Sequence, residues 1–209
     1  MHMTSKAMRD NELFMRTSFP GSGRWGIPCI KKQIIDICNP SFIAYSATKT
    51  KDIDKNLQKG VHFFLDDYRF NSIYKNPQKS LAKLSQYAYL ITPDYSTYSQ
   101  MKPWRQIESI AHSRWCGAYW QSKGLTVIPA ITWSTPASFT YCFDGIEKGA
   151  IVAISTIGCV KYKFAFLRGY NAMLARLEPS AILCYGEPFK EMQGNVIHIE
   201  YNHPRKAGD

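Results

Sequence analysis

The chain has 209 residues, of which 45% are hydrophobic and 14% aromatic, so a sizeable core can form and disorder along the whole chain is excluded. No apolar run is long enough to span a bilayer and the first residues lack the apolar centre of a signal peptide, so we expect a cytoplasmic protein without a membrane partner. The 26 Lys and Arg against 16 Asp and Glu give a formal net charge of +10, which favours polyanions, nucleic acid first. A basic chain that simply stays soluble is the alternative, because no arginine-rich tract accompanies the charge.

Three regions are expected along the chain. Residues 1–40 are predicted to form an irregular lead-in, because glycine, proline and serine punctuate it. Its GSG matches neither GxGxxG nor GxxxxGK[ST], so an ordinary turn is the interpretation. Residues 41–201 are predicted to form a single α/β domain, and residues 202–209 a flexible tail.

Short β-favouring runs are spaced along the domain. They predict strands at 42–46, 61–65, 89–91, 125–131, 150–154, 181–184 and 196–201. Apolar residues at helical spacing predict helices at 76–87 and 103–122. Two more helices are expected, one at 136–144 that Thr135-Pro136 opens and one at 164–177 that Pro179 stops. The last strand alternates apolar and polar residues, which is typical of an edge strand, and Pro129 indicates a bulge or an edge in its own strand.

Strands separated by helices indicate parallel βαβ units. We expect a small or incomplete TIM-like (β/α) barrel with about seven mainly parallel strands, since a complete barrel takes about 250 residues. The alternative is an open doubly wound parallel sheet. The barrel is favoured for two reasons. No glycine-rich dinucleotide-binding motif follows a strand, and polar residues occur after most of the predicted strands instead of gathering at a single topological switch point.

Parallel strands bring their carboxyl ends to one face, where ligands bind in such folds. Asp66, Asp94 and Glu187 follow three different strands, and we expect them to converge as a catalytic acidic centre. One carboxyl group with a raised pKa would act as a general acid while another stays ionised as base or nucleophile. They could instead hold Mg²⁺. A purely local alternative has Asp66 or Asp67 capping the next helix and Asp94 pairing with Arg69.

Other polar and aromatic residues on the same face are candidates for ligand binding. Arg69 is the expected anion contact, and flat aromatic rings suit a base or a sugar. The full predicted ligand-binding set is Asp67, Arg69, Tyr95, Trp133, Ser134, Thr156 and Tyr185.

The histidines and cysteines are interpreted as structural. His62 and His198 lie within strands, where packing or hydrogen bonding explains them, and no serine or cysteine partner indicates a nucleophile triad. The six cysteines show neither CxxC nor a Cys/His spacing suited to zinc, so no metal ligand is assigned and reduced thiols are expected.

Several unusual motifs occur together: FFLDDYRF, TPDYS, RWCGAYWQSKGLTVIP, TWS, FDGI, AISTIGC and ILCYGE. Over roughly residues 24–190 they resemble the domain-of-unknown-function family 4417, a family of bacterial, phage and mobile-element proteins. The resemblance implies a relationship but supplies no reaction, cofactor or catalytic residue. The phage and mobile-element context adds weight to a nucleic-acid partner.

Two hypotheses follow, and whether the chain is an enzyme separates them. In the first, the strand-end face binds or processes a phosphate-bearing or nucleotide-like small molecule, with Asp66, Asp94 and Glu187 as the acidic centre. In the second, the chain is a non-catalytic nucleic-acid-binding or protein-binding accessory module that uses its basic surface.

Overall fold

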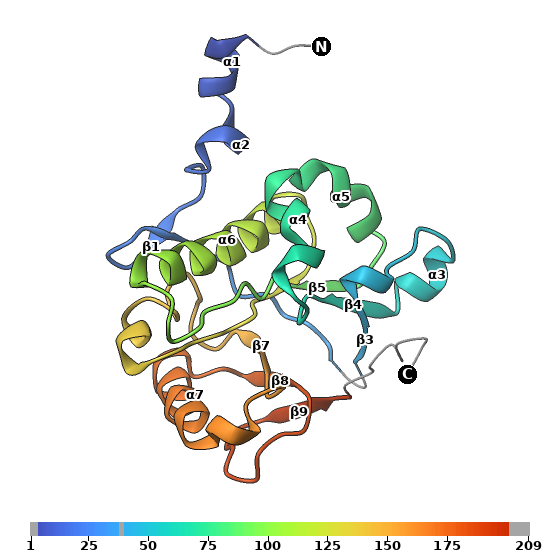
Figure 1. Ribbon diagram of the computed structural model, residues 1–209. Coiled ribbons are helices and arrows are strands. Elements are labelled where there is room, and N and C mark those ends of the chain that lie inside the picture. Colours follow the sequence, from blue (N-terminus) through green and yellow to red (C-terminus); the bar gives the residue numbers. More distant parts are fainter. Residues whose placement is uncertain (1–3, 38–39, 201–209) are drawn as a thin grey trace, which may run out of the picture.

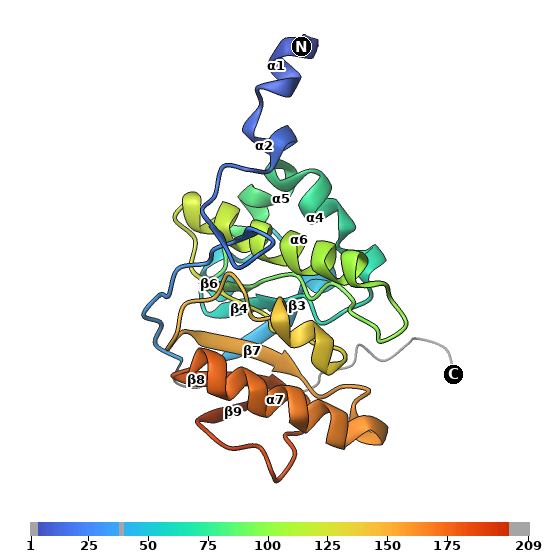
Figure 2. The ribbon, with the colours of Figure 1, turned by 90° about the vertical axis from the view of Figure 1, so that its left-hand side faces the viewer.

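The structure, a computed structural model, describes residues 4–37 and 40–200 (Figure 1). The predicted tail, 202–209, lies outside the described residues. Two short helices, α1 (Ser5–Arg9) and α2 (Glu12–Met15), project away from the body in both Figure 1 and Figure 2. The lead-in also holds an antiparallel pair, β1 (Gly21–Ser22) and β2 (Ile27–Pro28), where sequence predicted only a turn. Gly23 and Gly26 between them have φ of 69° and 60°, a backbone region that glycine enters without strain.

All seven predicted strands are present: the strand at 89–91 has the predicted boundaries, and the boundaries of the other six are shifted. They are β3 (Ser41–Ala44), β4 (Lys59–His62), β5 (Tyr89–Ile91), β6 (Val127–Ile128), β7 (Ile151–Ser155), β8 (Ala181–Tyr185) and β9 (Val196–Ile199). Within the described residues they form a four-stranded sheet in the order β3-β4-β5-β6 and a three-stranded sheet in the order β7-β8-β9. Every pair in these two sheets is parallel, and β9 is an edge strand as predicted.

Helices and turns connect the strands. The helices are α3 (Ile53–Asn56), α4 (Asn71–Lys75), α5 (Pro77–Leu84), α6 (Pro103–Ser122) and α7 (Lys163–Leu177). The residues that the structure describes also hold four 3₁₀ turns, η1 (Tyr45–Ala47), η2 (Asp67–Arg69), η3 (Pro136–Thr140) and η4 (Val160–Tyr162). The predicted helix at 136–144 is therefore only a 3₁₀ turn, and the predicted helix at 76–87 is α5 with α4 immediately before it.

The two sheets meet at one point. Ala130, just after β6, forms a parallel bridge with Ala153 of β7, and the Ile131 amide donates to the Ala153 carbonyl at 2.8 Å. The strands thus follow one another in chain order, without the reversal that a doubly wound sheet requires. A closed barrel is not observed, because no described strand pair joins β9 back to β3.

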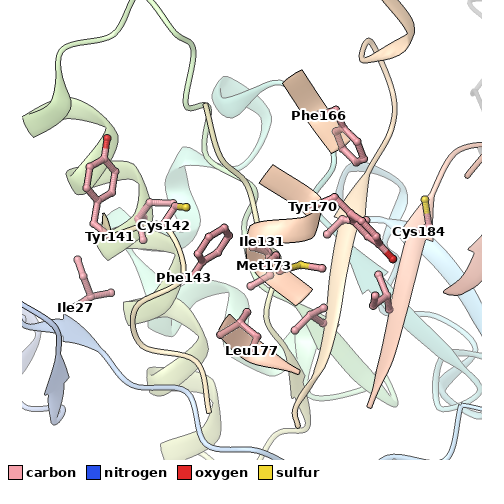
Figure 3. Packing of buried hydrophobic residues seen from close by; sticks show 14 residues of the cluster. Ile27, Ile131, Tyr141, Cys142, Phe143, Phe166, Tyr170, Met173, Leu177 and Cys184 are labelled. Atoms are coloured by element: carbon pink, nitrogen blue, oxygen red, sulfur yellow. The ribbon is translucent and has the colours of Figure 1, made fainter. Parts of the chain in front are cut away.

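Buried side chains gather on both faces of the sheets. One cluster packs α6, α4 and α5 against β4–β6, with Trp115 and Trp120 among its fully buried members. A second packs α7 against β7 and β8, where Tyr170, Met173 and Leu177 face the sheet (Figure 3). A third cluster draws on strands of both sheets, including Ile91, Ile128, Ala153, Leu183 and Ile199. Leu90 and Ile91 are neighbours in β5 but belong to different clusters, so the third cluster lies on the opposite face of that strand from the α6 cluster. Ile27 and Ile30 of the lead-in are also buried in this body.

Candidate functional site

Buried hydrogen bonds fix the ends of β5 and β6. Thr92, directly after β5, is fully buried and its hydroxyl oxygen accepts from the Ala130 amide at 2.9 Å. The Ser113 hydroxyl of α6 donates to the same oxygen at 3.1 Å. These bonds join two strand ends and the long helix, so the loops that follow the strands start from fixed positions.

Arg114 performs a similar role one residue further along α6. It is 0% exposed, and its guanidinium donates to the backbone carbonyls of Ala130, Cys142 and Asp144 at 2.8, 3.0 and 3.3 Å. Burial lowers its pKa to about 10, so it stays charged at neutral pH. Arg114 interrupts the apolar stripe of α6 between Ile110 and Ala118, and this is the sequence signal that could have identified it.

Asp94 lies three residues after the end of β5. Its residue is only partly exposed, and its carboxyl group forms no hydrogen bond or ion pair with any described residue. Burial raises the pKa of Asp94 to about 7, the nearby Asp67 carboxylate adds to the rise, and Arg114 opposes it. A carboxyl group with this pKa can both give and take a proton at neutral pH.

Asp67 supplies the second carboxylate beside Asp94. It opens η2 after β4, and it accepts from the Ser96 hydroxyl at 3.0 Å and from the Ser96 amide at 3.2 Å. Next to this pair, the hydroxyls of Thr97 and Thr132 are 3.0 Å apart. The Cys159 thiol, after β7, is also near: burial raises its pKa and the Asp94 charge raises it further. Loops after four strands therefore meet around Asp94.

The other two predicted catalytic carboxylates are not brought together with Asp94. Asp66 has a side chain that is 72% exposed and pairs with Arg69 at 3.7 Å. The Glu187 side chain is 88% exposed, with its carboxylate 3.8 Å from His198 Nε2. In the part of the chain that the structure describes, no three His, Cys, Asp or Glu side chains are grouped to hold a metal ion. Their catalytic role and the Mg²⁺ site stay predictions.

The local alternative does not describe the site either. Asp66 occupies the cap position of η2, but its side chain makes no cap hydrogen bond. Arg69 pairs with Asp66 and lies over the Tyr68 ring at 5.5 Å, so it is not the partner of Asp94.

Most predicted ligand-binding residues make contacts inside the protein. Tyr95 is 5% exposed in the core, with its ring 5.1 Å from that of Phe70. Trp133 is half-buried against Phe166. The hydroxyls of Ser134 and Thr156 donate to Gln106 Oε1 at 2.9 Å and to the Tyr185 carbonyl at 3.4 Å. Tyr185 is itself buried, stacked on Phe64 at 5.2 Å. Ligand binding by these residues stays a prediction.

His62 has an environment that the sequence did not indicate. It ends β4, is 5% exposed, and its ring centroid lies 4.4 Å from that of Tyr185 on β8. Its Nδ1 is buried without a hydrogen-bond partner among the described residues. Burial lowers the pKa of His62 to about 4, so the ring is neutral at physiological pH. The β4 and β8 ends thus place a neutral imidazole against a phenol ring.

The five cysteines within the described residues, Cys29, Cys116, Cys142, Cys159 and Cys184, are free, whereas Cys38 lies outside them. Burial raises the pKa of each described thiol. None of the described helices combines the length and apolar character needed to cross a membrane.

These features define the class of the protein: an α/β protein with two parallel sheets whose polar loops gather at the strand ends. The chain belongs to the family described as "Domain of unknown function (DUF4417)", whose model matches residues 19–202. This confirms the resemblance drawn from the sequence motifs.

Two viral proteins are similar to the chain. The "Gene 1 protein" of Mycobacterium phage L5 is 34% identical over 189 residues, covering 89% of this chain and 82% of that protein. The "Gene 1 protein" of Mycobacterium phage D29 is 36% identical over 177 residues, covering 83% of this chain but only 65% of that protein. No solved structure matches the chain.

Proposed function

We propose that the strand-end face binds a phosphate-bearing or nucleotide-like ligand and processes it by acid–base chemistry centred on Asp94. The observation that supports this most is the Asp94 carboxyl group itself. It is largely enclosed, has no described hydrogen-bond partner, and lies beside a second carboxylate, Asp67. Two acidic groups held this way cost stability, and such arrangements are concentrated at functional sites.

In this proposal the two carboxyl groups have different roles. Asp94 exchanges a proton with the ligand, because its pKa of about 7 leaves both forms populated at neutral pH. Asp67, which accepts hydrogen bonds from Ser96, is the second carboxylate of the site, a role for which the sequence had indicated Asp66 and Glu187. The phosphate class is inferred from the net charge of +10 and from the exposed Lys102, on the loop after β5, and Lys161, on the loop after β7.

We also propose a more specific fold for the domain. The two sheets act as one incomplete (β/α) barrel with the site at its mouth. Support comes from the Ala130–Ala153 bridge and from the core cluster that both sheets share. Figure 2 shows the loop before α6 and the start of α7 on the same side of the sheets, toward which β7 points.

A thermal-shift screen of nucleoside phosphates, with and without Mg²⁺, tests the proposal. A ligand present at about 100 times its Kd should add about 2.7 kcal/mol to the stability of the native protein and raise its Tm. Asp94→Asn should abolish the shift, whereas Asp54→Asn, at an exposed position of α3, should leave it unchanged. An equal shift in the Asp94 variant would show that the ligand binds elsewhere.

The second candidate is a non-catalytic nucleic-acid-binding module, and one observation favours it. Large aromatic side chains are exposed on the loops, 3₁₀ turns and first helical turns that follow β4, β5 and β7: Tyr68 (70%), Tyr98 (65%), Trp104 (68%), Tyr162 (71%) and Phe164 (88%). Such rings stack on unpaired bases, and basic residues beside them attract the backbone. Binding of single-stranded DNA or RNA that weakens steeply with salt and is unchanged by Asp94→Asn would favour this candidate over the first.

A further inference from the structure

A cavity open to solvent lies away from Asp94, between the segment that follows β3 and the helices α4 and α5. Its volume is about 360 Å³, and its wall includes Tyr45, Thr50, Ser72, Asn76, Lys79 and Lys83. A hollow of about 230 Å³ adjoins it through Asn76 and Lys79, and carries Arg16 and Lys75 in its wall. Neither wall contains a carboxylate, so every charged residue in the two walls is basic.

Lys79 and Lys83 are the main source of that charge. They stand four residues apart on α5, a spacing that brings side chains to the same helix face and makes like charges repel. In the part of the chain that the structure describes, neither lysine forms an ion pair. An anion in the cavity would neutralise both.

Lys83 is held in place rather than free in solvent. Its Nζ lies 4.3 Å from the centroid of the Tyr45 ring, a cation–π contact, and the residue is half-buried. Burial lowers the pKa of Lys83, in keeping with an ammonium group that has lost part of its hydration shell. A partly dehydrated cation without a counter-charge binds an incoming anion more strongly than a hydrated one does.

Neutral donors line the same wall. The hydroxyls of Thr50 and Ser72 and the side-chain amide of Asn76 form no hydrogen bond with any described residue, and all three residues are exposed and line the cavity. Two ammonium groups, two hydroxyls and one amide exceed what a carboxylate or a halide needs. They match a phosphate group, whose several oxygens all accept hydrogen bonds.

We propose that this cavity binds a phosphate group, with Lys79 and Lys83 as charged contacts and Ser72, Thr50 and Asn76 as neutral donors. The site is distinct from the strand-end site, because none of the residues around Asp94 lines it. The phosphate group can come from a free phosphorylated molecule or from a nucleic-acid backbone, and the two sources make the same contacts.

Calorimetric titration of the whole chain at low ionic strength tests the site, with inorganic phosphate in one arm and a single-stranded DNA oligonucleotide in the other. The test variant is Lys79→Gln/Lys83→Gln, since glutamine preserves helix propensity while removing charge. The control is Lys55→Gln/Lys190→Gln, which removes the same charge at exposed positions outside both cavities. Lys79→Gln alone, at an exposed position, keeps the test valid if the double variant fails to fold.

We expect the test variant to bind at least about tenfold more weakly than the control. Weaker binding of inorganic phosphate identifies a site for small phosphorylated molecules. If only the oligonucleotide binds, and the test variant alone weakens it, the site recognises a nucleic-acid backbone. The proposal is overturned if test and control variants bind both probes equally, because any remaining effect would then come from net charge.

Discussion

Replacing Asp94 by asparagine removes an ionisable group from the strand-end face while nearly preserving its shape. In the fold the pKa of Asp94 is about 7, against an ordinary value of 3.8, chiefly because the carboxyl group is buried. The folded state therefore holds the proton more tightly than the unfolded chain does. The stabilisation that the Asp94 carboxyl group contributes is fully present below pH 3.8, and it is lost as the pH rises toward about 7.

The size of the effect follows from that difference in pKa. Between 3.8 and about 7 the cost of the ionised carboxylate reaches about 4 kcal/mol. Asp94 keeps some contact with solvent, which screens the charge, so we expect about 2 to 4 kcal/mol. Asparagine carries no charge at any pH, and the variant should avoid this cost.

Urea unfolding of wild type and Asp94→Asn, at about pH 5 and about pH 8, measures the difference. The variant should be more stable at the higher pH, with an advantage that grows by about 2 kcal/mol between the two conditions. Asp54→Asn, exposed on α3, should show no such growth. An advantage that is absent, or equal at both pH values, would refute the assignment of a buried, ionisable Asp94.

Three further variants test other parts of the structure. Arg114→Met should lower the free energy of unfolding by about 3 to 5 kcal/mol, because three backbone carbonyls lose their donor, whereas exposed Arg105→Met should change it by about 0.5 kcal/mol or less. Gly169→Ala should cost about 1 to 3 kcal/mol, since the added Cβ would lie 2.1 Å from Trp133 Nε1; an unchanged Tm would contradict this packing. His62→Phe should remove a loss of stability below pH 6.5, observable by urea unfolding across that range.

Much of the fold could be predicted because local signals and packing agree. The α6 helix occupies the predicted 103–122, where apolar spacing and a first-turn proline coincide. The strand at 125–131 was predicted too long, because Pro129 offers no amide and β6 ends at Ile128. The 3₁₀ turn η3 stands in place of a helix at 136–144, where Arg114 of α6 takes up the carbonyls of Cys142 and Asp144. No local sequence pattern indicates these long-range hydrogen bonds.

The orientation of the side chains around Asp94 could not be predicted from the sequence. Asp66 and Asp67 are neighbours in the chain, yet one faces solvent and the other holds Ser96 beside Asp94. The position of each aspartate relative to the 3₁₀ turn η2 decides which side chain is exposed, and two neighbouring residues of the same type carry no sequence signal of that difference. A binding role for Lys79 and Lys83 could not be predicted from the sequence either. It depends on a cavity wall without carboxylates, and only the folded chain brings the residues of that wall together.

His62 ends β4, Asp94 lies three residues after the adjacent strand β5, and the two groups respond to pH in opposite senses. The pKa of His62 is about 4, below its ordinary 6.5, so its contribution to stability is present above pH 6.5 and is lost as the pH falls toward 4. Asp94 loses stability as the pH rises over nearly the same range. The contributions of these two groups to the pH dependence of stability therefore offset each other in the wild type. Each single variant should uncover the slope of the other group: stability that rises with pH in Asp94→Asn and falls in His62→Phe. Two ionisable groups with opposite pKa shifts, one at the end of β4 and one in the loop after β5, are a costly arrangement for a purely structural rim, and this adds to the physical reasons to look for chemistry there.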